Sequence, residues 1–118
     1  MSLLETRETT LKDRMPAGLL DSIVEKLNPI RVIVFGSQVT GNTHVDSDWD
    51  LLIVVDDDTP TERIDSGGID DVRRHIRGAM DLIPLRETNF RDHVDIVGSL
   101  PWIALNEGAV IYERSSAN

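Results

Sequence analysis

The sequence predicts a single α+β domain in which a mixed β-sheet is backed by helices. Its 118 residues suffice for one hydrophobic core and leave no room for a second domain. Apolar runs typical of strands cover residues 32–35 and 48–55. Apolar residues at helical spacing lie before and after these runs, so strands and helices alternate along the chain. The order alone does not fix the topology of the sheet.

The first part of the chain predicts a helix that packs on the sheet. Residues 1–15 are polar, and we expect a loose N-terminal arm or a short helix there. An apolar stripe at helical spacing follows, with Pro16 in its first turn and with Asn28 and Pro29 as its end. The members of the stripe are Leu19, Leu20, Ile23, Val24 and Leu27.

After the second apolar run the chain becomes highly charged. Residues 56–58 are three aspartates, which we interpret as a solvated loop, with a metal site as the alternative. A helix is expected over residues 69–79. Its outer face carries Arg73, Arg74 and Arg77. We interpret these arginines as a solvated face, with a phosphate or partner contact as the alternative.

The last third of the chain predicts a third strand, two short helices and a final short strand. Residues 79–85 form the third strand, and Pro84 places it at an edge or a bulge. Thr88 and Ser99 are the expected helix caps, and Gly108 ends the second helix. Residues 109–112 form the last strand. The apolar residues of the first helix have helical spacing, and in the second helix Trp102 and Leu105 are expected to face inward; the spaced residues are Phe90, Val94 and Val97.

The composition excludes several classes of function. The net charge is −9, and no Lys or Arg occurs between residues 32 and 62, so we expect no direct binding of duplex nucleic acid. The chain has no cysteine, which excludes disulfides, thiolate catalysis and zinc sites with cysteine ligands. No apolar run approaches about 18 residues, and residues 1–14 lack the apolar core of a signal peptide. We therefore expect a cytoplasmic protein with no membrane partner.

Two aspartates open the second predicted strand. Side chains alternate faces along a strand, so Asp48 and Asp50 point the same way and Trp49 points the other way. Two carboxylates this close repel each other unless a cation lies between them. Mg²⁺ prefers such oxygen ligands and completes its shell with water and substrate phosphates. A cation site is therefore expected here, with Mn²⁺ as an alternative to Mg²⁺.

A joint pattern surrounds these aspartates. Gly36 and Ser37 end the first strand, Gly41 follows, and residues 47–52 read SDWDLL. This arrangement resembles the GS…G…SDxDLL signature of the nucleotidyltransferases related to DNA polymerase beta, in particular the minimal nucleotidyltransferase branch. The resemblance implies a nucleotidyltransferase-like fold. It also implies transfer of a nucleoside monophosphate, AMP from ATP being the first choice, to an acceptor hydroxyl with two Mg²⁺ ions.

The resemblance assigns roles to individual residues. Asp48 and Asp50 would hold both ions, while Gly36 and Ser37 would hold the β- and γ-phosphates of the nucleotide. A third carboxylate comes from a later strand in the family, and Asp81 is the position that fits. It would serve the ion that activates the attacking hydroxyl. Asp95 competes for this role, but its segment has helical spacing, so we favour Asp81 as the catalytic and metal-binding residue.

The sequence also departs from the family pattern. Members often carry arginine one residue after the Gly-Ser pair and again before the next glycine, and here Gln38 and Thr40 stand there. A weaker hold on the triphosphate is expected, which Gln38→Arg should improve. His44 and Asp46 are weaker candidates, the first for a phosphate contact and the second for a ligand.

A second hypothesis is an interaction module. Minimal nucleotidyltransferases that resemble this chain are often antitoxins paired with a HEPN-type ribonuclease toxin. Such an antitoxin acts by binding the toxin or by adenylylating it. An acidic surface would favour encounter with a basic nuclease.

Overall fold

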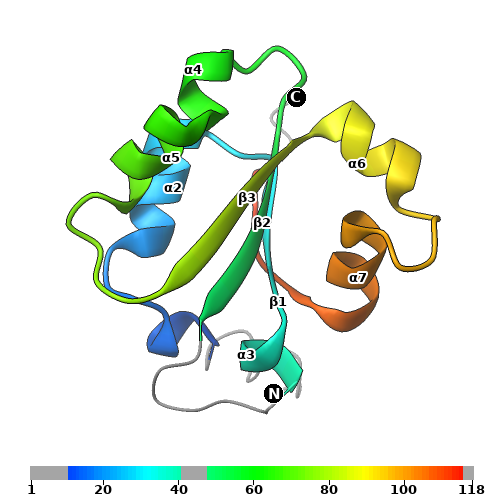
Figure 1. Ribbon diagram of the computed structural model, residues 1–118, viewed down its shortest axis with the longest axis horizontal. Coiled ribbons are helices and arrows are strands. Elements are labelled where there is room, and N and C mark those ends of the chain that lie inside the picture. Colours follow the sequence, from blue (N-terminus) through cyan, green and yellow to red (C-terminus); the bar gives the residue numbers. More distant parts are fainter. Residues whose placement is uncertain (1–10, 41–47, 116–118) are drawn as a thin grey trace.

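The computed structural model describes residues 11–40 and 48–115. A four-stranded sheet in the order β3-β2-β1-β4 lies between two layers of helices (Figure 1). Residues 11–14 are also helical. The strands are β1 (Arg31–Phe35), β2 (Trp49–Val55), β3 (Met80–Arg86) and β4 (Ala109–Glu113). The helices are α2 (Leu19–Leu27), α3 (Ser37–Thr40), α4 (Thr61–Ile64), α5 (Ser66–Arg73), α6 (Glu87–His93) and α7 (Leu100–Glu107).

The sheet is mixed, as the sequence predicted. β1 pairs antiparallel with β2 on one side and with β4 on the other. β2 pairs parallel with β3, which is therefore an edge strand. Pro84 lies in β3, where a residue without an N–H group is tolerated because one side of the strand has no partner. The edge position expected from Pro84 is confirmed.

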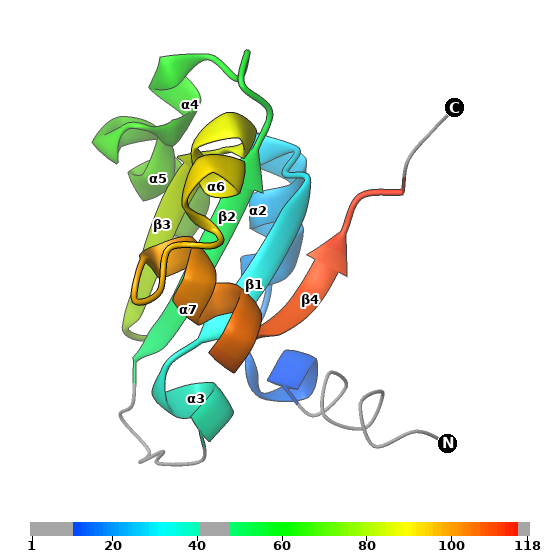
Figure 2. The ribbon, with the colours of Figure 1, turned by 90° about the vertical axis from the view of Figure 1, so that its right-hand side faces the viewer.

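Each face of the sheet has its own hydrophobic cluster, because successive side chains of a strand point to opposite faces. Trp49, Leu51 and Ile53 of β2 pack with the side chains of α2 and α5. Leu52 and Val54 pack on the other face with Phe90 of α6 and Ala104 of α7. Figure 2 shows α6 and α7 in front of the sheet, with α2 and α5 behind it. The expectation of a sheet backed by helices is confirmed.

α2 is the packing helix predicted from its apolar stripe. Leu19, Ile23 and Leu27 are buried, and each contributes about 1.5–3 kcal/mol relative to an exposed side chain. The helix ends at Asn28, which adopts a left-handed conformation with a φ of 45°. It begins at Leu19 rather than near Pro16, because Gly18 at its N-cap has a φ of 80° and cannot continue a helix.

The helix expected over residues 69–79 begins and ends earlier in the structure. α5 begins at Ser66, where Asp65 caps it by accepting a hydrogen bond from the Gly68 amide at 2.9 Å. It ends at Arg73, and His75 follows with a φ of 69°. The predicted C-terminal end was therefore wrong, since the backbone leaves the helical region before Arg77.

The first of the two helices in the last third is shorter than predicted, whereas the second has the predicted ends at Ser99 and Gly108. α6 begins at Glu87, with Arg86 rather than Thr88 at its N-cap, and Val97 is 77% exposed. α7 begins after Ser99, whose side chain accepts a hydrogen bond from the Trp102 amide, so this predicted cap is confirmed. Leu105 is 45% exposed rather than buried. The inward position expected of Leu105 was wrong, although the residue lies within α7, and Val97 lies in the connection after α6 rather than in a helix.

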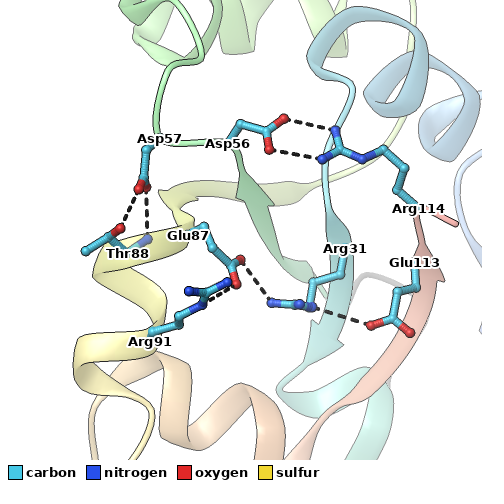
Figure 3. Close-up of polar contacts among 8 residues, drawn as sticks. All are labelled: Arg31, Asp56, Asp57, Glu87, Thr88, Arg91, Glu113 and Arg114. Carbon is cyan, nitrogen blue, oxygen red and sulfur yellow. Dashed lines mark hydrogen bonds and ion pairs between the residues drawn. The ribbon is translucent and has the colours of Figure 1, made fainter. Parts of the chain in front are cut away.

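The acidic loop after β2 is held by partners from the protein itself (Figure 3). Asp56 forms a two-pronged pair with Arg114, with contacts of 2.9 and 3.0 Å. Asp57 accepts hydrogen bonds from the backbone amide and the hydroxyl of Thr88, at the first turn of α6. These interactions favour a structural role for the loop and speak against a metal site made of the consecutive aspartates.

A second group of charges lies beside this loop in Figure 3. Glu87 at the start of α6 pairs with Arg31 of β1 at 3.2 Å and with Arg91 at 2.9 Å. Arg31 also approaches Glu113 of β4 at 3.7 Å. Ion pairs thus connect β1 with α6 and β4 at this end of the sheet. None of the helices in the described residues is long and apolar enough to cross a membrane.

Candidate active site

The turn from β1 into α3 is in direct contact with the start of β2. Gly36 has a φ of 82°, a left-handed conformation that residues with a Cβ atom rarely adopt. A Cβ atom at this position would lie 2.4 Å from Oδ2 of Asp50, because Phe35 and Asp50 are paired in the register of β1 and β2. Both the backbone conformation and the close approach therefore require glycine.

Asp50 and Asp81 are register partners on neighbouring parallel strands. Their side chains leave the same face of the sheet, because paired residues of adjacent strands share a face. Their backbones are about 4.8 Å apart, the usual spacing of paired strands. Asp50 is half-buried and Asp81 is exposed. Asp81 thus lies on the same face as Asp50, as the reading of the sequence required.

Electrostatic repulsion marks the same group of residues. Burial raises the pKa of Asp50 above its ordinary value of 3.8, and the negative charges of Asp81 and then Asp48 raise it further. Asp48 is exposed and directly precedes β2. Trp49 points to the opposite face and is buried there, which confirms the predicted alternation. Carboxylates that repel one another in this way attract cations.

The described carboxylates do not by themselves form a complete metal-binding site. Within residues 11–40 and 48–115, no group of three or more His, Asp or Glu side chains converges closely enough to hold a metal ion. Two carboxylates are nevertheless a sufficient protein contribution for Mg²⁺, whose remaining ligands are usually water and substrate phosphates. Asp50 and Asp81 therefore match the donor chemistry of a magnesium site that the substrate completes.

Arg14 is a residue of this region that the sequence did not reveal. It donates hydrogen bonds from Nη1 to Oε1 of Gln38 at 3.1 Å and from Nη2 to the Gln38 carbonyl at 3.2 Å. Its guanidinium also lies 5.7 Å from the centre of the Trp49 ring. Gln38 is buried, so it is a core residue and not an exposed neighbour of the phosphates. No periodicity or motif links residues 24 positions apart, so only the fold brings this pair together.

Other candidates lie away from the carboxylates. Gly41, His44 and Asp46 lie outside the described residues. Asp95 is exposed beyond the end of α6, whereas Asp81 belongs to the sheet. His93 contacts the Asn89 carbonyl at 2.9 Å. The arginines at the end of α5 are on the helix layer that covers the opposite face of the sheet from Asp50, which disfavours a role for them at the phosphates.

Comparison with known proteins gives the family. The model of the nucleotidyltransferase domain family matches residues 17–103, which include Gly36, Asp50 and Asp81. The chain belongs to the nucleotidyltransferase domain family. It is a polymerase beta-like nucleotidyltransferase of the minimal type, as the sequence motif indicated. The family supports transfer of nucleoside monophosphates as its general activity and a nucleoside triphosphate as its substrate.

A solved structure supports the same assignment for this nucleotidyltransferase. The chain is similar to a Sulfolobus solfataricus protein whose crystal structure is described as that of a "putative nucleotidyltransferase". The identity is 25%, the TM-score is 0.52, and the match covers 92% of this chain and 88% of the other. Among curated proteins none matches the chain.

Proposed function

We propose that this nucleotidyltransferase transfers AMP from ATP to a hydroxyl group of an acceptor. The observation that carries the proposal is the pairing of Asp50 with Asp81 beside the Gly36 turn. It places two carboxylates where a backbone turn can come close to a phosphate chain. The cytoplasm supplies both ATP and Mg²⁺, so we also propose this compartment.

Asp48, Asp50 and Asp81 would hold two Mg²⁺ ions. The half-buried Asp50 and its negatively charged neighbours fit divalent cations, because a bound cation offsets both the burial and the repulsion that raise the pKa of Asp50. When bound, such ions neutralise charge on the attacking and leaving oxygens of an in-line displacement. The same oxygen ligands would accept Mn²⁺.

The residues of the chain have separate tasks in this proposal. Ser37 and the backbone at Gly36 bind the β- and γ-phosphates and orient the α-phosphate. Asp81, the exposed member of the pair, takes the proton of the acceptor hydroxyl as that oxygen bonds to the α-phosphorus. The bond from the α-phosphorus to the bridging oxygen breaks, and pyrophosphate leaves with that electron pair.

The proposal is tested with ATP labelled at the α-phosphate. Wild-type protein, Mg²⁺ and candidate acceptors, including co-purifying proteins, should give a labelled product. Asp81→Asn should abolish transfer and leave ATP binding largely intact, because its carboxylate serves the hydroxyl. The control is Asp58→Asn in the exposed loop beyond β2, which should keep full activity. Equal transfer by Asp81→Asn would contradict the assignment of Asp81.

A second function has one specific observation in its favour. Ile96 and Val97, in the connection between α6 and α7, are 52% and 77% exposed. Exposed apolar side chains flanked by acids such as Asp92 and Asp95 suit a protein partner with a basic rim. We therefore also propose an antitoxin-type module that binds or adenylylates a HEPN-type ribonuclease.

The partner function has its own test. Val97→Asp should weaken capture of the co-expressed ribonuclease, because it places a charge in the apolar contact. Asp58→Asn is the control. If the variant captures the ribonuclease as well as the wild type does, this surface is not the interface.

A further inference from the structure

Arg14 joins two segments that border the proposed nucleotide site. Through Gln38 it contacts α3, which directly follows the Gly36 turn, and its guanidinium also stacks over Trp49, the first residue of β2. Trp49 in turn lies between Asp48 and Asp50 in the chain. One side chain therefore links the turn proposed to bind phosphates to the strand that carries the carboxylates.

The segment that carries Arg14 is fixed on the core. Leu11 and Met15 are 2% and 8% exposed, and the Met15 amide donates to the Leu11 carbonyl at 3.1 Å. In Figures 1 and 2 this short helical turn, in dark blue, lies next to α3 at the same end of the sheet. Residues 11–15 therefore belong to the packed domain. Because the backbone on both sides of Arg14 is anchored, its contacts can hold another element in place.

The contact between Arg14 and Gln38 is important for the structure because Gln38 is buried. It is the one buried polar or charged residue in the described part of the chain, with 7% of its surface exposed. Buried polar groups need hydrogen bonds, and bonds from a charged donor are about twice as strong as neutral ones. Arg14 gives Gln38 two of these, one to the side chain and one to the backbone carbonyl. The backbone contact holds α3 itself as well as the Gln38 side chain.

The charge distribution also singles out Arg14. The sequence has no Lys or Arg between residues 32 and 62, so β1, α3 and β2 carry no cation of their own after Arg31. Arg14 brings a cation to this region from 24 residues before Gln38. The contact is on the Trp49 side of the sheet, opposite to Asp50, so Arg14 acts on the site through α3.

We propose that Arg14 is a positioning residue for nucleotide binding, which holds the Gly36 turn and α3 against the start of β2. The inference rests on the proposed function. It gives residues 11–15 a role in binding the triphosphate of the nucleotide. Loss of Arg14 would let the turn move relative to Asp50 while leaving the carboxylates in place.

The test compares Arg14→Ala with Arg114→Ala. Arg114 also forms a two-pronged contact, with Asp56, but at the opposite end of β2, so its loss controls for a general decrease in stability. Arg14→Ala should raise the KM for ATP about tenfold, equivalent to about 1.4 kcal/mol. It should leave kcat at saturating ATP nearly unchanged. A general structural defect would instead lower the folded fraction and hence the apparent kcat.

A spectroscopic measurement separates local from global effects. The chain has two tryptophans, so a Trp102→Phe background makes Trp49 the sole reporter. ATP with Mg²⁺ should change Trp49 emission in this background, and adding Arg14→Ala should remove the change at ATP concentrations that saturate the parent. Gln38→Ala should raise the KM less than Arg14→Ala does, because the contacts of Arg14 with the Gln38 carbonyl and with Trp49 remain. The double variant Arg14→Ala, Gln38→Ala should resemble Arg14→Ala, because that change already removes the contact with the Gln38 side chain.

The outcomes distinguish this inference from the function on which it rests. A KM effect in Arg14→Ala but not in Arg114→Ala supports it. If wild-type protein binds ATP and Arg14→Ala binds it equally well, the inference is wrong and the proposed function stands. If the wild type binds no nucleoside triphosphate in the presence of Mg²⁺, both are wrong. Equal KM effects in both arginine variants would also overturn the positioning role.

Discussion

The backbone of Gly36 and the carboxylate of Asp50 are so close that no side chain fits between them. A Cβ on Gly36 would lie 2.4 Å from Oδ2 and 3.3 Å from the carboxyl carbon of Asp50. The first distance is well below any ordinary contact, and the atom met is the end of a side chain whose movement would displace the carboxylate. The glycine therefore protects the geometry of the acidic pair as well as the turn.

Gly36→Ala should lose both stability and nucleotide binding. Gly98→Ala is the matched control, since Gly98 has a φ of 87° but no atom within 4 Å of the added Cβ. Both variants incur the cost of a left-handed alanine, about 1–2 kcal/mol. Gly36→Ala should be destabilised by about 1 kcal/mol more in urea unfolding, because Asp50 must move. Equal losses in the two variants would show that the contact with Asp50 is unimportant.

The raised pKa of Asp50 gives its stability effect a definite sign. The folded-state pKa is above the ordinary value of 3.8. Between these two pH values the native state therefore binds more protons than the unfolded state. The contribution of Asp50 is thus favourable below pH 3.8 and is lost as the pH rises through the folded-state pKa. Asp50→Asn should therefore be more stable than the wild type at about pH 7 and no more stable at about pH 3. Urea unfolding at both pH values measures the difference.

Asp56 should show the opposite pH dependence. Its hydrogen bonds with Arg114 lower its pKa below 3.8, so the pair stabilises the protein above that pH. The stabilisation is lost as the pH falls through the lowered pKa of the folded state. Because both side chains are about one-third exposed, Asp56→Asn should cost only about 0.5–1 kcal/mol at neutral pH. A loss that persists undiminished in strong acid would contradict this origin.

Much of this architecture follows from local sequence. The helix that ends at Asn28, the strands around Ile33 and Leu52, and the edge position of Pro84 all depend on periodicity or backbone preference. Such signals act within a few residues, so the sequence displays them. The motif around Asp48 and Asp50 was readable for the same reason.

Other features depend on contacts between distant residues. α5 ends at Arg73 because the following backbone turns back to the sheet, although the arginines beyond it are good helix formers. The pairing of Asp50 with Asp81 needs the parallel register of β2 and β3, which no local pattern specifies. The burial of Gln38 depends on Arg14, which lies in a segment with little periodicity of its own.

Divalent cations should stabilise the protein through the carboxylate pair. A ligand at ten times its Kd adds about 1.4 kcal/mol, which corresponds to a rise in Tm on the order of 5 °C for a domain of this size. Millimolar Mg²⁺ or Mn²⁺ should produce such a shift in the wild type. It should vanish in the Asp50→Asn, Asp81→Asn double variant. The control is Asp56→Asn, which should have a lower Tm but keep the metal-induced shift, and loss of the shift in this control would place the metal at the acidic loop.

Gln38→Arg should damage the site, although the family pattern alone suggests that an arginine there would improve it. Gln38 is buried and accepts a hydrogen bond from Arg14, so a second guanidinium would meet the first in a buried position. We expect a stability loss of about 1–3 kcal/mol and weaker ATP binding. The reciprocal variant Arg14→Gln, Gln38→Arg restores one donor and one acceptor and should recover part of both losses. Urea unfolding and calorimetric titration with ATP test these expectations. If Gln38→Arg alone is fully stable and binds ATP more tightly, the arginine reaches the phosphates directly and the contact with Arg14 is dispensable.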